Sequence, residues 1–82
     1  MKKKKLLLKI LTNLKNVKFN EFVSVVEAFG CRLSRTRGSH HIFTHQDIVE
    51  LINLQNVHGQ AKPYQVRQFL ELVEKYNLRL EE

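Results

Sequence analysis

The sequence predicts a small α+β domain, in which a three-stranded antiparallel sheet carries helices on one face. Three observations lead to this fold class. The chain has 82 residues, enough for one domain and not for two. Apolar residues recur at helical spacing near both ends of the chain, whereas period 2 dominates between them. The connections between the expected strands are short, which favours antiparallel pairing.

Two helices are expected before the sheet. Leucines and an isoleucine recur at helical spacing over residues 6–14, with lysines on the other face. This pattern predicts a basic amphipathic helix whose leucines pack on the domain; contact of its lysines with RNA or a membrane surface is a less favoured alternative. A second apolar stripe runs from Phe19 to Phe29, and Gly30 stands where a helix stop is expected. We therefore divide the chain into an N-terminal helix, residues 1–16, and a domain, residues 17–82.

The three strands and the last helix follow in order. In the first strand, Cys31, Leu33 and Arg35 are expected to share one face by alternation. The strands are predicted at residues 31–36, 40–45 and 49–54. Residues 56–60 are expected to form a loop. Pro63 suits the first turn of a helix that ends near Tyr76, and a polar-ended tail follows it.

Charge is distributed unevenly along the chain. The formal net charge is +6, but residues 1–18 carry seven lysines and no acids, and the remainder is close to neutral. A basic isoelectric point is therefore weak support for nucleic-acid binding. A local cluster of Arg32, Arg35 and Arg37 is better support, because no acidic residue occurs between Glu27 and Asp47.

Cysteine content and hydropathy indicate a cellular compartment. Cys31 is the single cysteine, so no intrachain disulfide can form, and we expect it to be a small core residue in a reducing compartment. The lysine-rich start superficially resembles a signal peptide, but Lys9 interrupts the apolar run almost at once. No stretch approaches the ~20 apolar residues of a membrane span. We expect a soluble cytoplasmic protein without membrane contact.

The most informative stretch is a pair of histidines after a tight turn. Histidine is the side chain whose ordinary pKa suits proton transfer near neutral pH. Strand alternation places His41 beside Phe43, the largest apolar group, and so turns His40 toward the open face or the rim. Such a histidine beside clustered arginines suits chemistry on a phosphodiester. From the residues alone, a structural role for the pair is the more frequent outcome. The run reads Gly38-Ser39-His40-His41-Ile42-Phe43.

With this element order and the Gly-Ser-His-His-Ile-Phe-x-His run, the chain resembles the HicA toxin family over about residues 17–77. That family's fold resembles a double-stranded-RNA-binding domain. The resemblance implies a toxin of a type II toxin–antitoxin pair, a metal-independent mRNA endoribonuclease that a HicB antitoxin neutralises. It implies no cofactor. The histidine after the Gly-Ser pair carries activity in the family and maps onto His40, with His41 as the adjacent alternative.

The expected site follows from this resemblance and the neighbouring charges. His40 is the predicted general acid or base, with Gly38, Ser39 and His41 in support. We expect the RNA to be bound by Arg35, Arg37, Lys62 and Arg67, and we expect no metal ion, because the histidines lack a zinc spacing.

Several alternatives stay open on the sequence. Tyr64, Phe43 and Arg67 could stack on or pair with bases, but core packing and helix solvation explain them equally well. Many family members carry a Val-Pro-x-His run where this chain has residues 55–58, so a counterpart role for His58 is open. A non-catalytic RNA-binding module and a pure interaction protein are the rival functions. We expect the free toxin to be a monomer.

Overall fold

The protein is described by a computed structural model that covers residues 2–81. It contains three helices and one antiparallel sheet whose strands lie in the order β1-β2-β3-β4. The predicted α+β class, with a double-stranded-RNA-binding-like domain and an added N-terminal helix, is confirmed. The helices are α1 (Lys2–Thr12), α2 (Phe19–Ala28) and α3 (Pro63–Lys75), and the strands are β1 (Arg32–Arg37), β2 (His40–His45), β3 (Ile48–Val57) and β4 (Gln60–Ala61).

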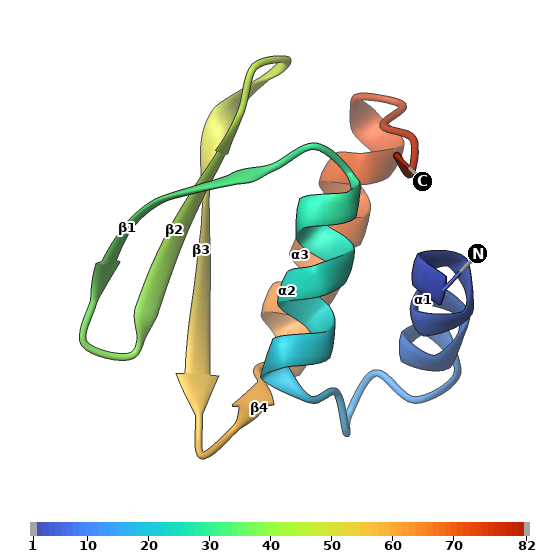
Figure 1. The fold of residues 1–82 in the computed structure, drawn as a ribbon, viewed down its shortest axis with the longest axis vertical. Coiled ribbons are helices and arrows are strands. Elements are labelled where there is room, and N and C mark those ends of the chain that lie inside the picture. The colour runs from blue at the N-terminus through green and yellow to red at the C-terminus, as the bar shows by residue number, and fades with distance from the viewer. Residues whose placement is uncertain (1, 82) are drawn as a thin grey trace.

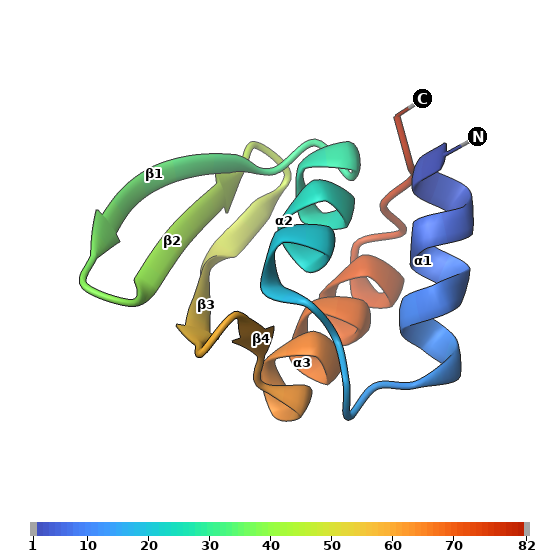
Figure 2. The ribbon, with the colours of Figure 1, turned by 60° about the horizontal axis from the view of Figure 1, so that its bottom comes forward.

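The elements form layers. Helices α2 and α3 cover one face of the sheet and leave the other face open (Figure 1). Helix α1 lies on the far side of these two helices from the sheet, as the turned view also shows (Figure 2). Ile10 of α1 is buried, and Lys9 of α1 pairs with Glu21 of α2 at 3.1 Å. The predicted packing of the N-terminal leucines on the domain is confirmed, because Leu6, Leu7 and Leu14 pack against the core.

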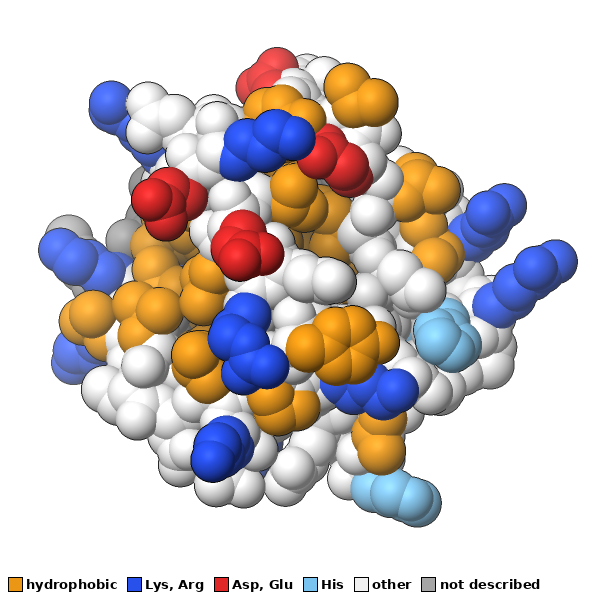
Figure 3. All heavy atoms as spheres, turned by 180° about the vertical axis from the view of Figure 1, so that it is seen from behind, with side chains coloured by type: hydrophobic (Ala, Val, Ile, Leu, Met, Phe, Trp, Pro, Cys, Tyr) orange, Lys and Arg blue, Asp and Glu red, His pale blue; other side chains and the backbone are white. Residues whose placement is uncertain are grey.

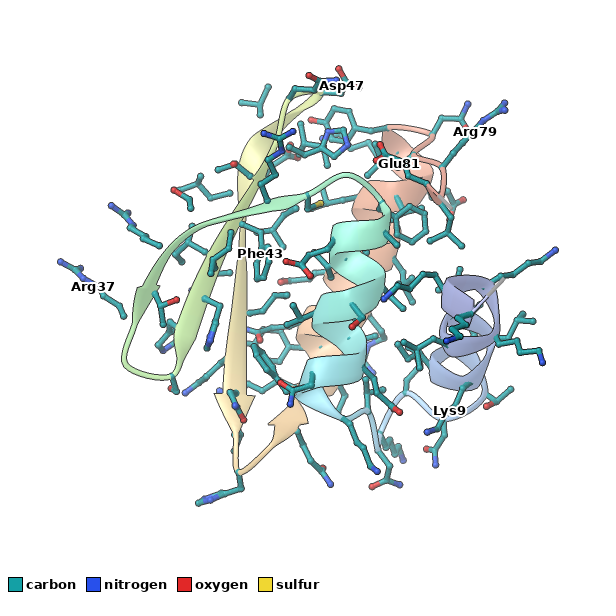
Figure 4. The ribbon with its side chains drawn as sticks, viewed as in Figure 1. Lys9, Arg37, Phe43, Asp47, Arg79 and Glu81 are labelled. Atoms are coloured by element: carbon teal, nitrogen blue, oxygen red, sulfur yellow. The ribbon has the colours of Figure 1, made fainter. Side chains whose placement is uncertain are left out.

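The core lies between the sheet and the helices. The rings of Phe22 and Phe29 both approach Phe69 edge-on, at centroid distances of 5.7 Å. Edge-to-face packing of this kind suits the quadrupoles of aromatic rings. Cys31 is buried as expected, and Phe43 of β2 points inward from the sheet (Figure 4). One large apolar core therefore fixes which face of β2 is turned toward the helices.

The prediction of a loop at residues 56–60 is wrong. Strand β3 continues to Val57, and β4 returns antiparallel to it with Val57 opposite Gln60. The two turn residues, His58 and Gly59, have positive φ angles of 52° and 84°, as a two-residue hairpin turn with the twist of its strands requires. The sheet therefore has four strands rather than three.

The alternation predicted for the first strand is also wrong. The register between β1 and β2 shifts between Leu33 and Arg35, so Ser34 is an extra residue in a β-bulge. A bulge reverses the parity of everything beyond it. Arg35 consequently leaves the face of Leu33 and joins the face of Arg32.

The tail after α3 is better anchored than its polar composition suggested. Leu78 and Leu80 pack against the core, and the backbone N–H of Glu81 donates to the carbonyl of Ala28 at 2.6 Å. Residue 82, the last of the predicted tail, lies outside the described range.

Candidate functional site

A tight turn joins β1 to β2 and presents the histidine pair. Arg37 and His40 lie opposite each other in the register, so Gly38 and Ser39 alone make the turn. Gly38 has a φ of +56°, which most other residues adopt only with strain. The carbonyl of Ser39 accepts the backbone N–H of Asn56 at 2.9 Å, so the turn is fixed to β3. The positive φ at position 38 explains why a glycine precedes the serine.

The two histidines point to opposite faces of the sheet, as alternation predicted. The ring of His41 lies 4.8 Å from the ring of Phe19 on the helix side, and its Nδ1 lies 3.2 Å from the carbonyl oxygen of Ser39. His40 is half-buried on the other side, where its Nδ1 lies 3.2 Å from Oδ1 of Asn53. His41 thus packs against the core, while His40 faces the open side.

Asn53 bears on the chemistry available to His40. With the amide oxygen toward the ring, Nδ1 must donate its hydrogen to that oxygen. In the neutral imidazole the lone pair then sits on Nε2, which no other described residue contacts through a hydrogen bond. With the amide oxygen toward the ring, the contact therefore leaves Nε2 as the nitrogen that can accept a proton. Sequence patterns gave no sign of Asn53, because its proximity depends on the register of β3 against β2.

The arginines of β1 share the face of His40. Directly opposite residues in an antiparallel pair point the same way. Arg37 lies opposite His40 and Arg35 opposite Ile42, and Figure 4 shows Arg37 projecting away from the helices. Arg32 lies opposite Thr44 and joins the same face because of the bulge. All of β1 is exposed, so these guanidinium groups face solvent.

A line of hydrogen bonds connects the turn to α3. Nε2 of Gln55 donates to the hydroxyl of Ser39 at 3.2 Å, and the backbone N–H of Gln55 donates to Oε1 of Gln65 at 2.8 Å. Gln65 is the buried polar residue of the described core, with 6% of its surface exposed. A buried amide with a specific partner restricts the packing of two elements. The sequence patterns did not predict a role for Gln55 or Gln65. The only signal was that Gln65 is a polar residue beside the apolar stripe of α3.

Lys62 and Arg67 occupy a different element from the other predicted residues. Lys62 directly precedes α3, and Arg67 is exposed on that helix. Within residues 2–81 neither side chain forms a hydrogen bond or ion pair with the turn or with His40. The ammonium group of Lys62 instead lies 5.7 Å from the ring centroid of Tyr64. The structure thus unites the turn, His40, Arg35 and Arg37 on one sheet face and leaves two cations at the neighbouring start of α3.

The other titratable groups have structural surroundings. Both ring nitrogens of His45 are occupied, since Nε2 lies 3.1 Å from the Phe29 carbonyl and Nδ1 accepts the Asp47 N–H at 3.0 Å. His58 is exposed in the β3–β4 turn. Burial, followed by the nearby Glu81 carboxylate, raises the pKa of the Cys31 thiol to about 11. That thiol stays protonated at neutral pH and is a poor nucleophile.

The chain segments that supply the candidate site contain no acidic residues. No Asp or Glu occurs between Glu27 and Asp47 or between Glu50 and Glu71, and these two stretches supply all the residues of the candidate site. Figure 3 shows acidic side chains gathered in the upper half of the view, whereas histidines lie lower, beside basic side chains. The cations of these stretches would attract a polyanion toward the histidine.

A cavity of about 760 Å³ lies elsewhere. It opens between the end of α2, the start of β1 and the tail after α3, and none of the predicted site residues lines it. His40 instead lies on the open face of the sheet. Within residues 2–81, no three His, Cys, Asp or Glu side chains come together as a metal-binding group. The same range contains no helix long and apolar enough to cross a membrane.

A model of one protein family matches residues 19–74; its description is "HicA toxin of bacterial toxin-antitoxin". The chain belongs to the HicA toxin family. The match spans α2, the whole sheet and most of α3, so it contains every residue assigned to the site. Comparison with curated proteins and with solved structures gave no match. Family membership identifies a toxin of a toxin–antitoxin system, and α1 lies outside the HicA match.

Proposed function

We propose that this HicA-family toxin is a metal-independent endoribonuclease that cleaves mRNA, with His40 as the general base. The observation that carries the proposal is the contact of His40 with Asn53, which leaves Nε2 unprotonated in the neutral ring. A base with its lone pair facing an open, cationic surface suits removal of a proton from RNA. Gly38 and Ser39 form the turn that holds this histidine, and His41 anchors the turn to the core.

The chemistry needs little from the protein, because RNA supplies its own nucleophile. Nε2 of His40 takes the proton of the 2′-hydroxyl, and the 2′-oxygen forms a bond to phosphorus. The bond from phosphorus to the 5′-oxygen breaks, and that oxygen takes a proton from water. The products are a 2′,3′-cyclic phosphate and a 5′-hydroxyl. General-base assistance of this kind typically contributes roughly 10²–10⁴-fold to the rate.

The cations would bind the substrate and stabilise charge. Arg35 and Arg37 flank His40 on the same face and would contact phosphate oxygens, whose negative charge grows in the transition state. Lys62 and Arg67 would bind the strand where it passes the start of α3. A HicB antitoxin would neutralise the toxin by covering His40 and this basic face.

The decisive experiment compares wild type with His40→Ala on a single-stranded RNA, with and without a chelator. Wild type should cleave in both conditions, and the variant should lose activity by at least about 10²-fold. Thr44→Ala is the matched control, an exposed residue on the same face of the same strand. Full cleavage by the His40 variant, or cleavage that the chelator abolishes, would refute the proposal. Growth arrest upon induction should follow the same pattern, and co-expressed HicB should relieve it.

The arginine row also fits a second candidate, an RNA-binding module that does not cut. Three arginines on one open sheet face can hold phosphates without any catalysis. Salt-sensitive binding by wild type that leaves the RNA intact would identify this function.

A further inference from the structure

Tyr64 differs from every other aromatic side chain of the protein. All five phenylalanines are buried in the core, and Tyr76 is half-buried. Tyr64 exposes 48% of its surface from the first turn of α3, immediately after Pro63. Core packing therefore does not explain the position of this ring. Helix solvation is the ordinary explanation that remains beside base stacking.

Tyr64 lies next in the chain to Gln65, which is hydrogen-bonded to the strand beside the turn of His40. Nε2 of Gln65 lies 3.5 Å from the Tyr64 hydroxyl, and Oε1 of the same amide accepts the N–H of Gln55 at 2.8 Å. Gln55 in turn donates to Ser39. The hydrogen bonds thus form a continuous line from the tyrosine to the residue before His40. These contacts place the start of α3 at the end of the sheet that holds His40, where Gln55 lies opposite the histidine.

The surroundings of the ring favour a nucleic acid. The Lys62 ammonium lies 5.7 Å from the ring centroid, within the range of a cation–π contact, and Arg67 is exposed on the same helix. No acid occurs between Glu50 and Glu71. Figure 3 shows hydrophobic, basic and histidine side chains mixed in the lower half of the view. An exposed ring among cations is the usual platform for a base whose phosphates are held alongside.

We infer that Tyr64 is a stacking platform for an unpaired nucleobase next to the cleaved phosphate, so that the substrate is single-stranded at this point. The inference rests on the proposed function and specifies its substrate class. A base in a duplex is stacked on its neighbours and cannot place its face on a protein ring. The phosphates flanking the stacked base would lie toward Lys62 on one side and the arginines of β1 on the other.

The test uses binding rather than cleavage, in the His40→Ala background. The probe is a short single-stranded RNA that carries one 2-aminopurine, a base whose fluorescence is quenched by stacking. Tyr64→Ala should weaken binding by roughly tenfold or more and abolish the quenching, the effect expected for loss of one base–aromatic stack. Tyr64→Phe should keep both, because it keeps the ring and loses only a long, weak hydrogen bond. Leu8→Ala, an exposed apolar residue on the distant α1, should change neither.

A duplex of the same sequence provides the second arm, and its affinity should not depend on Tyr64. Unchanged single-strand affinity and quenching in Tyr64→Ala would overturn the inference, as would an equal loss with the duplex. These outcomes are separate from the proposed function. If the His40 variant still cleaves, the catalytic assignment fails while the stacking result stands; if the His40 variant is inactive and Tyr64→Ala binds normally, only the stacking platform fails.

Discussion

The contact of His40 with Asn53 bears on which ring nitrogen of His40 is free. Strand alternation alone predicted that His40 and His41 would point to opposite faces, because side-chain direction in a strand is a local property. The partners of these residues were not predictable in this way. Asn53 and Gln55 reach the turn only through the pairing of β3 with β2, and Gln65 only through the packing of α3. The sequence therefore predicts that His40 points to the open face, but not which residues hold the turn and its ring in place.

Asn53→Asp tests this residue-scale assignment. A carboxylate in place of the amide would stabilise the protonated form of the adjacent imidazole, and a protonated ring cannot act as a base. The ascending limb of the pH–rate profile should therefore move to higher pH. Asn53→Ala should lower kcat by about tenfold, because it removes a group that orients the catalytic base. It should shift the ascending limb of the pH–rate profile less than Asn53→Asp does.

Measurement of kcat against pH for wild type and both variants checks the prediction. A merely structural role for Asn53 would lower activity equally at every pH. An identical profile for wild type and Asn53→Asp would show that this side chain does not govern the tautomer or the charge of His40.

At the scale of elements, two local irregularities separate the structure from its prediction. The bulge at Ser34 adds an unpaired residue within β1, and the tight turn at His58 joins β3 to a fourth strand. Neither feature has a strong sequence signal. Glycine at the second turn position was visible, but histidine rather than asparagine precedes it. Helices α2 and α3 were predicted well because their apolar stripes and their Gly and Pro boundaries act locally.

The contact that joins β3 to the end of α3 should make stability depend on pH. The Tyr76 hydroxyl donates to Glu50 at 2.6 Å and Lys75 donates to it at 3.0 Å; the tyrosine contact first, and then the lysine, lower the pKa of the Glu50 carboxyl to about 2. A carboxyl with a lowered folded-state pKa stabilises the fold fully above its ordinary value of 4.5. That contribution is lost as the pH falls from 4.5 through about 2.

Urea unfolding of wild type and Glu50→Gln measures this effect. Wild type should be the more stable at pH 7, and the difference should shrink once the pH falls below 4.5. Glu74→Gln is the matched control, since Glu74 is an exposed carboxylate of α3 beside Lys75 that forms no side-chain hydrogen bond or ion pair within residues 2–81; it should change stability little at any pH. A difference that persists unchanged at pH 2 would contradict the role of the charged carboxylate.

At the scale of the whole molecule, the two basic regions of the sequence lie apart. The lysines of residues 2–9 belong to α1, on the far side of α2 and α3 from the sheet, whereas the arginines of β1 lie on the open sheet face (Figures 1 and 4). Lys9 and Arg37 project from opposite sides of the molecule (Figure 4). No sequence pattern could reveal this separation, because it depends on which layer α1 joins. Most of the net charge of the chain therefore lies away from the candidate site.

Salt-dependent RNA binding can distinguish the two regions. In the His40→Ala background, Arg35→Gln together with Arg37→Gln should weaken binding and reduce the slope of log affinity against log salt by about one to two, since each phosphate contact on single-stranded RNA contributes roughly 0.7. Lys2→Gln together with Lys5→Gln removes the same charge from α1 and should leave the slope within error. Equal losses in the two variants would show that the RNA does not follow the sheet face.

The bulge at Ser34 also bears on how the length of this chain can vary. Without Ser34, the pairs of Arg32 with Thr44 and of Arg35 with Ile42 would belong to one regular ladder, and all three arginines would keep their present face. A deletion at this position therefore removes twist from the edge strand without reversing the side chains, whereas deletion of Thr36 would make Arg35 and Arg37 neighbours and turn them to opposite faces. Ser34 is thus a position where a lineage of such toxins could gain or lose a residue and keep its basic surface.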